Sequence, residues 1–264
     1  MSAKDTFNIS RFSLLVRQYF IHNNRIMLYS VIGYCGVVFL VLSMVQLEDS
    51  AARPLDVEYF IAFLTASVAV IGILFTGHSF QAFRASQTTA NYLTIPASTL
   101  EKFLFELFYR FGSTLIILPL LFWVTFHSQG YFFQLFIESK FIPVSFTEVV
   151  QDLVSEADNA YWIITFIAAL SMFALSIAFT GAAHFSKQPL VKTLFSVTVI
   201  ILFFVVFIYV VFEQLGLESY RLNESLWLLP STDTSAFRSF SIAAILGTLL
   251  MLSVSFLKLK EKEA

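Results

Sequence analysis

The chain has 264 residues, of which 58% are hydrophobic and 13% are charged, whereas soluble domains carry about 25% charged residues. Its mean hydropathy of +0.78 excludes an ordinary soluble domain and predicts a membrane protein. The formal net charge of -2 gives no basic excess for binding nucleic acid. The single Cys35 excludes an intramolecular disulfide and a cysteine-based zinc cluster.

The first 20 residues carry no long apolar run followed by a small-residue cleavage site, so no removable signal peptide is expected. Residues 7–22 instead predict an amphipathic helix lying in the membrane interface. Its apolar side would hold Phe12, Leu15, Val16, Tyr19 and Phe20. The alternative is that this segment extends the first membrane span.

Six apolar runs follow, each long enough to cross a bilayer as a helix, which takes about 20 residues. They predict an all-α, polytopic membrane protein with one transmembrane domain over residues 1–264. The expected spans are 26–47, 59–80, 104–126, 161–185, 190–212 and 240–257. Pro119 in the third span predicts a kink or a hinge.

An even number of spans puts both termini on one side of the membrane, and the side is chosen by the positive charges. Twelve of the 16 basic residues fall on the side of the termini: Lys4, Arg11, Arg17, Arg25, Arg84, Lys102, Arg110, Lys187, Lys192, Lys258, Lys260 and Lys262. We therefore expect both termini in the cytoplasm and a multi-pass protein of the cell (inner) membrane. On the outer side, residues 145–159 predict a short surface helix, and the connection over 213–239 dips into the membrane or forms a free loop.

Motifs for bond chemistry are missing from the chain, so no catalytic residue, metal ligand or cofactor is expected. There is no His-Glu-x-x-His, Gly-x-Ser-x-Gly or P-loop pattern, and the histidines lie near the ends of spans: His22, His78, His127 and His184. Energy from ATP would have to come from another chain. An intramembrane enzyme would require a cluster of residues such as His78, Glu106 and Arg110.

Three alanines, Ala174, Ala178 and Ala182, recur at four-residue spacing in the fourth span. Small residues at this spacing let helices approach closely. The stripe predicts packing within the chain, with a subunit interface as the alternative.

The polar interruption between the second and third spans carries the most specific local signal. Ser98 and Glu101 form the pattern of a capping box, so a helix begins here, and Pro96 separates it from the preceding segment. Lys102, Glu106 and Arg110 then form a charged stripe along one side. If exposed, each pair contributes only about 0.2 to 0.5 kcal/mol, so reversing Lys102 or Glu106 should cost little.

A second feature of this interruption is a group of apolar residues on the expected cytoplasmic side, namely Tyr92, Leu93 and Ile95. A cap alone does not need them. They predict a surface on which a cytoplasmic partner docks.

Two stretches here resemble the permease subunits of type 2 ABC transporters, particularly the short six-span members from Bacteroidetes. They are "YLTIPASTLEKF" at 92–103, preceded by "FQAFRASQTTAN", and "HFSKQPLVKTLF" at 184–195. The resemblance implies that two permeases and two ATPases form the transporter, and that the segment between spans two and three contacts the ATPase. Carried over, this contact comprises Gln87, Tyr92, Leu93, Thr94, Ile95, Pro96, Ala97 and Ser98, and the base of the third span comprises Ser98, Glu101, Lys102 and Glu106. Lys187 and Lys192 fall in the second cytoplasmic loop, and "RASQTTAN" is less charged than is usual in the family.

The resulting expectation is a permease subunit that couples a separate ATPase to export of a hydrophobic or amphipathic substrate. Its partners would be an ABC ATPase subunit holding ATP and Mg, a second copy of itself or a related permease, and membrane lipid. The chain itself would not be an enzyme. The alternative is a membrane scaffold or sensor that recruits a cytoplasmic partner without transport, and lipid, glycan, peptide and drug remain open as cargo.

Overall fold

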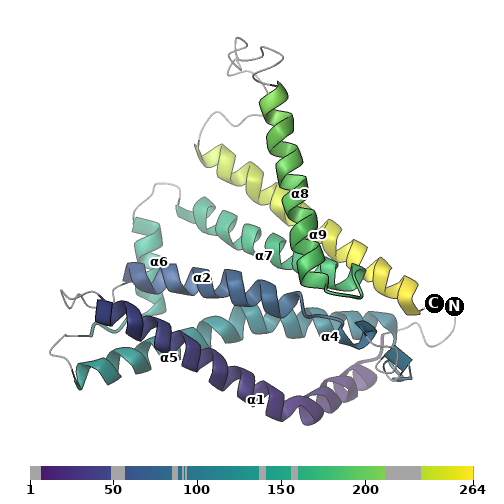
Figure 1. Ribbon diagram of the computed structural model, residues 1–264, viewed down its shortest axis with the longest axis horizontal. Helices are drawn as coiled ribbons and strands as arrows, with labels where there is room; N and C mark the ends of the chain where they lie inside the picture. Colours follow the sequence, from purple (N-terminus) through teal and green to yellow (C-terminus); the bar gives the residue numbers. More distant parts are fainter. Residues whose placement is uncertain are drawn as a thin grey trace. The chain divides into compact units, whose positions relative to one another are not determined.

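The computed structural model describes residues 7–48, 57–84, 89–90, 92, 94–136, 141–155, 160–211 and 233–263. All regular secondary structure within these residues is helical, and six of the helices are long and apolar enough to cross a membrane (Figure 1). The predicted all-α, multi-pass architecture is therefore confirmed. The chain divides into two compact units. The expectation of one transmembrane domain over residues 1–264 stays a prediction.

The first unit contains residues 1–76, residues 91–158 and Glu263. Helix α1 in this unit packs against α4 and α5, and α2 packs against α4, α5 and α6. The elements are α1 (Ile9–Glu48), α2 (Val57–Thr76), α4 (Thr99–Gly112), the π-helix η2 (Ser113–Ile117), α5 (Leu118–Gln134) and α6 (Phe146–Ser155). Helix α6 confirms that a short helix lies within residues 145–159, and its place on the outer surface stays a prediction.

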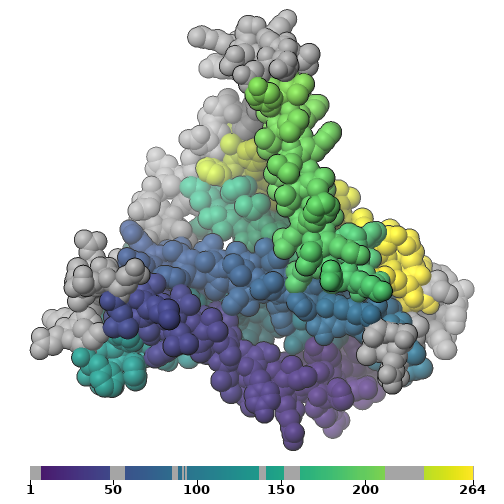
Figure 2. Space-filling model, in the orientation of Figure 1, coloured from purple at the N-terminus to yellow at the C-terminus, as the bar shows by residue number. Residues whose placement is uncertain are grey.

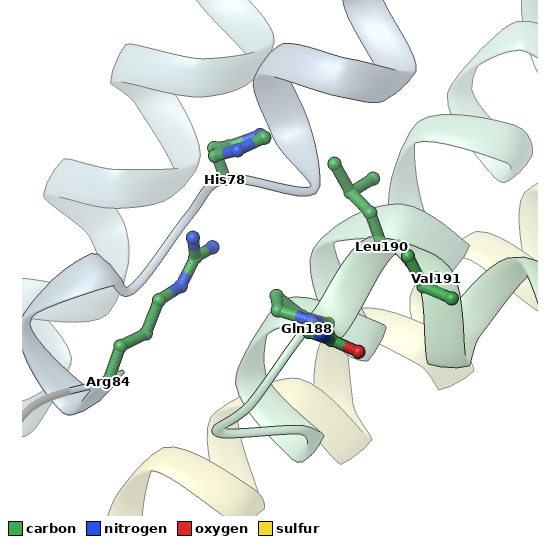
Figure 3. Close-up of a pocket in the computed structure, with 6 residues that line it drawn as sticks. His78, Arg84, Gln188, Leu190 and Val191 are labelled. Carbon is green, nitrogen blue, oxygen red and sulfur yellow. The ribbon is translucent and has the colours of Figure 1, made fainter.

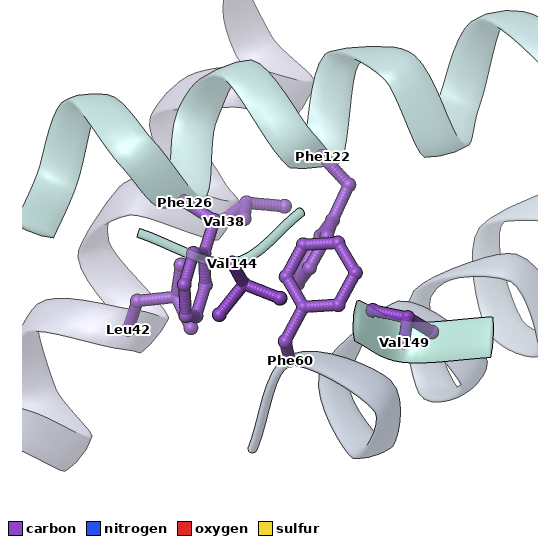
Figure 4. Packing of buried hydrophobic residues seen from close by; sticks show 7 residues of the cluster. All are labelled: Val38, Leu42, Phe60, Phe122, Phe126, Val144 and Val149. Atoms are coloured by element: carbon purple, nitrogen blue, oxygen red, sulfur yellow. The ribbon is translucent and has the colours of Figure 1, made fainter. Parts of the chain in front are cut away.

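An apolar cluster joins these helices at the end where α2 begins (Figure 4). The Phe60 ring of α2 lies at the centre, with its centroid 5.3 Å from the Phe122 ring and 5.1 Å from the Phe126 ring. Val38 and Leu42 come from α1, and Val144 and Val149 complete the cluster. Burial of these side chains fixes α1, α2 and α5 against one another.

Helix α1 runs unbroken through 40 residues and contains most of the predicted interfacial segment over 7–22 together with the predicted span over 26–47. Figure 1 shows that α1 bends along its length. A helix of this length measures about 60 Å, whereas the hydrocarbon core of a bilayer is about 30 Å thick. About half of α1 therefore lies outside that core unless it is steeply tilted, and an interfacial position for its first half stays a prediction.

The second span ends at Thr76, four residues before the predicted end at Phe80. Gly77 follows the helix, and a glycine is a common helix terminator. Phe80 then has φ 54°, a left-handed conformation that cannot continue an α-helix. The prediction failed because the apolar run continues through this turn.

The third span is longer than predicted, since helical residues extend from Thr99 to Gln134. The π-helix η2 interrupts it just before Pro119, and the N–H of Leu118 bonds to the carbonyl of Ser113. A proline ring clashes with the carbonyl four residues earlier, and a wider turn relieves that clash. The predicted irregularity near Pro119 is therefore present as a π-turn.

The second unit contains residues 77–90, residues 159–262 and Ala264. Its elements are the 3-10 helix η1 (Gln81–Arg84), α7 (Ala160–His184), α8 (Pro189–Tyr209) and α9 (Asp233–Glu263), whose last described residue belongs to the first unit. Beyond its first two turns, α8 exposes mostly large apolar side chains, seen in green in Figure 2. Helix α9 is longer at both ends than the predicted span 240–257. The predicted outer connection over 213–239 lies largely outside the described residues.

Candidate functional site

The start of α4 has the predicted capping box. Ser98 is the N-cap, and its hydroxyl accepts the N–H of Glu101 at 3.2 Å. The N–H of Ser98 in turn donates to Glu101 Oε2 at 2.9 Å. Both side chains are buried, so the helix start is held away from solvent.

The second carboxylate oxygen of Glu101 binds the beginning of α1. Glu101 Oε1 accepts the N–H of Asn8 at 2.7 Å and a guanidinium N–H of Arg11 at 3.1 Å. Asn8 also caps α1, because its Oδ1 accepts the N–H of Ser10 at 2.9 Å. One buried carboxylate therefore joins the starts of α1 and α4. We call Asn8, Arg11, Ser98 and Glu101 the Glu101 junction.

Lys102 lies beside this junction and is also buried, with 3% of its side chain exposed. Its Nζ is 3.1 Å from Glu263 Oε1 and 4.8 Å from the centroid of the Tyr92 ring. The Thr99 hydroxyl donates to the other oxygen of Glu263. A carboxylate and an aromatic face thus surround the ammonium group, as a buried cation requires.

One turn further along α4, Glu106 and Arg110 form a second buried pair with an Nε to Oε2 distance of 3.3 Å. Arg110 also donates to the carbonyl of Phe75 at 3.2 Å, and its guanidinium lies 4.4 Å from the centroid of the Phe75 ring. The side chains of Arg110 and Glu106 are 7% and 11% exposed.

The prediction that Lys102, Glu106 and Arg110 form an exposed stripe is therefore wrong. Aromatic rings cover the two cations: Lys102 lies over the Tyr92 ring, and Arg110 lies over the rings of Phe75 and Tyr109. Opposite charges four residues apart fit either a solvated or a buried helix side. In this chain, contacts with Phe75 of α2 and with Glu263 of α9 bury the charges.

The loop before α4 offers a small exposed surface. Thr94 and Pro96 are exposed, whereas Ile95 and Ala97 are half-buried. The N–H of Ala97 donates to the carbonyl of Ile95 at 2.8 Å, which closes a tight turn. Gln87 and Leu93, two of the expected contact residues, lie outside the described residues.

Tyr92 is half-buried, and its ring faces Lys102 rather than standing free. Burial raises the pKa of its hydroxyl well above the usual 10.0, and the negative charges of Glu106 and Glu263 raise it further. Tyr92 therefore packs against the buried charges, whereas Thr94 and Pro96 are the more accessible of the expected contact residues.

In the second unit, the two lysines of the expected cytoplasmic loop are exposed, whereas the alanines of the stripe are buried or half-buried. Lys187 and Lys192 are exposed, and Lys192 Nζ lies 5.8 Å from the centroid of the Phe185 ring. Ala178 and Ala182 are buried and Ala174 is half-buried. Gly181 lies on the same helix, where an added Cβ would collide with Thr193 of α8, so this part of α7 is packed closely against α8.

The residues named for an enzyme belong to two different units. Glu106 and Arg110 pair in the first unit, whereas His78 belongs to the second unit, where it lines a pocket with Arg84 (Figure 3). Among the described residues, no group of three His, Cys, Asp or Glu side chains is placed to hold a metal ion.

Sequence reasoning missed the partners of the buried charges, which come from distant parts of the chain: Asn8, Arg11 and Glu263. It also missed a second capping box at the start of α6, where the N–H of Ser145 donates to Glu148 Oε2 at 2.8 Å. The pattern Ser-x-x-Glu was a sufficient signal there. Sequence reasoning also missed two hydrogen bonds to the backbone of Val144. The N–H of Val144 donates to His127 Nε2, and the carbonyl of Val144 accepts the Nε1–H of Trp123.

The site so described has an exposed part and a buried part. Its exposed part is the turn at Thr94 and Pro96, and its buried part holds four charged side chains of α4, namely Glu101, Lys102, Glu106 and Arg110. Comparison with protein-family models, curated proteins and solved structures finds no match for this chain.

Proposed function

We propose that this protein is the transmembrane permease subunit of an ATP-driven exporter of the type 2 ABC class. It lies in the inner membrane with both termini in the cytoplasm, and it works as a dimer with a second copy or a related permease. A separate ABC ATPase binds ATP and Mg. The cargo is hydrophobic or amphipathic, in keeping with the apolar spans.

The observation that carries this proposal is the Glu101 junction. A partner that presses on the turn at Thr94 and Pro96 acts on a segment joined directly to Ser98 and Glu101. Because Glu101 also binds Asn8 and Arg11, a displacement of the turn moves the starts of α1 and α4 together. A plain cap that only ended a loop would not need this second set of bonds.

In the proposed cycle, ATP binding draws the two ATPase subunits together and pushes each turn toward the membrane. Spans α1 and α4–α5 tilt as a unit, because their buried charges make local bending costly. A path at the interface of the two permeases then opens to one side or the other, and the ligand selects between these two states. The chain supplies binding and motion, and the ATPase supplies the bond chemistry.

The test is affinity purification of the chain, tagged at its C-terminus and expressed with its genomic neighbours in mild detergent, followed by mass spectrometry and an ATPase assay. We expect a Walker-motif ATPase to co-purify and Pro96→Asp to abolish its binding. Ile142→Asp changes an apolar residue that is also exposed but lies in the loop before α6, and this matched control keeps the ATPase.

Recovery of the chain without any ATPase, under conditions that preserve other membrane complexes, would contradict the proposal. Co-purification of a kinase or a transcriptional regulator instead would favour the scaffold or sensor.

A further inference from the structure

The second unit contains a pocket of about 430 Å³ that the proposed function does not use (Figure 3). Its walls come from the turn after α2, from η1 and from the start of α8. The lining residues are His78, Arg84, Gln188, Pro189, Leu190 and Val191. Pockets that bind small molecules typically measure about 300 to 1,000 Å³, so the volume is sufficient for a polar headgroup.

The polar wall of the pocket is basic. Arg84 donates to the carbonyl of Gly77 at 3.2 Å, which fixes its side chain beside the turn. In Figure 3 the guanidinium of Arg84 points toward His78. An imidazole donates at least one N–H in either protonation state, and an arginine presents several N–H donors to an anion. No carboxylate is among the described residues that line the pocket.

The opposite wall combines apolar side chains with the first turn of α8. Gln188 precedes this helix with φ 51° and makes no side-chain cap bond. The N-terminus of a 21-residue helix adds a partial positive charge to the same pocket. Leu190 and the exposed Val191 extend from the pocket along the apolar helix.

The pocket is bounded by residues that adjoin the ends of two candidate membrane spans. His78 follows the end of the α2 span, and Gln188 precedes the α8 span. Residues at the end of one span and the start of another lie near the headgroup layer. A basic pocket at that depth, continued by an apolar wall, matches the charge and shape of a phospholipid.

We infer that this pocket binds the phosphate group of an anionic phospholipid. Arg84 and His78 hold the phosphate, and an acyl chain follows Leu190 and Val191. The inference is independent of ATP-driven transport, because a scaffold would carry the same pocket.

The experiment is native mass spectrometry of the full chain in mild detergent, titrated separately with phosphatidylglycerol, phosphatidylcholine and inorganic phosphate. We expect phosphatidylglycerol to bind more tightly than phosphatidylcholine. Arg84→Gln should weaken the affinity for phosphatidylglycerol by roughly tenfold to a hundredfold, because it removes a charge-assisted hydrogen bond. Arg25→Gln, which removes an exposed arginine of the first unit, should leave the affinity unchanged.

A second variant separates loss of binding from loss of folding, since Arg84 also holds the turn at Gly77. Val191→Asp places a carboxylate at the exposed edge of the pocket without removing Arg84. It should weaken the affinity for phosphatidylglycerol by a similar factor. Unchanged affinity in both variants would overturn the inference. Equal affinity for phosphatidylcholine, or binding of inorganic phosphate without binding of phosphatidylglycerol, would overturn the assignment to an anionic lipid.

Discussion

Glu101 accepts the backbone N–H of Asn8 at 2.7 Å, although the two residues are 93 positions apart in the chain. The same carboxylate caps α4 through Ser98, so a residue that looks like a local cap is also a tertiary contact. Two helix starts therefore depend on one side chain.

Replacing Glu101 by Ala should lower the free energy of unfolding by about 3 kcal/mol, the lower end of the range for breaking a buried ion pair. The lower end applies because the Arg11 side chain is 29% exposed and keeps part of its hydration. The measurement is chemical unfolding in mild detergent. Glu148→Ala removes the matching glutamate of the exposed capping box on α6 and should have a clearly smaller effect. Equal losses would show that Glu101 acts only as a cap.

Reversing the charge of Lys102 should destabilise the chain strongly, in contrast to the small cost expected from the sequence. Lys102→Glu places a second carboxylate beside Glu263 in a buried site, so we expect a loss of about 3 to 5 kcal/mol. The double variant Lys102→Glu with Glu263→Lys should recover part of it. Lys258→Glu breaks the more exposed pair with Glu261 and should cost less than about 1 kcal/mol. Similar unfolding midpoints for the two single variants would contradict the burial of Lys102.

Gly181→Ala should disturb the packing of α7 on α8, because the new Cβ would meet the side chain of Thr193. Overpacking of this kind costs about 1 to 3 kcal/mol, measurable as a lower unfolding temperature in detergent. Thr193→Gly in the same chain should restore stability. Gly36→Ala is the matched control, since nothing lies within 4 Å of its added Cβ. If both glycine variants behave alike, the close approach at Gly181 is wrong.

Tyr92 should make the folded chain less stable in alkaline solution. Its pKa in the folded chain lies above the usual 10.0, so above about pH 10 the unfolded chain releases the proton first. Stability is therefore complete below that pH and falls as the pH rises toward the folded-state pKa. Tyr92→Phe keeps the ring beside Lys102 but removes the hydroxyl, so the alkaline fall should shrink. Tyr161→Phe alters an exposed tyrosine and is the control. An identical fall in Tyr92→Phe and the parent chain would exclude this role.

The fold was predictable where the signal is local or a matter of length. Six apolar runs give six spans, and the pattern at Ser98 and Glu101 gives the start of α4. The end of α2 was not predictable from hydropathy, because Phe80 is apolar but lies in a left-handed turn. The first half of α1 was ambiguous, since an amphipathic segment and an extended span have similar sequences.

The candidate site was predictable only in part, because burial of a charge depends on residues far away in sequence. Lys102 and Glu106 have the spacing of a surface pair. No local pattern predicts that Glu263 contacts Lys102 or that Phe75 contacts Arg110. Tyr92 was expected to face a partner, yet its ring covers Lys102. A contact at 93 or 161 residues of separation is set by helix packing, which local patterns do not specify.

The most direct test of the central claim is photo-crosslinking in cells from a photoreactive amino acid placed at position 96, with position 142 as the control. The proposed function predicts a crosslink from position 96 to a Walker-motif ATPase and none from position 142. Crosslinks from position 96 to lipid alone, or to a regulatory protein without an ATP site, would contradict the assignment of the turn at Thr94 and Pro96 as the ATPase contact.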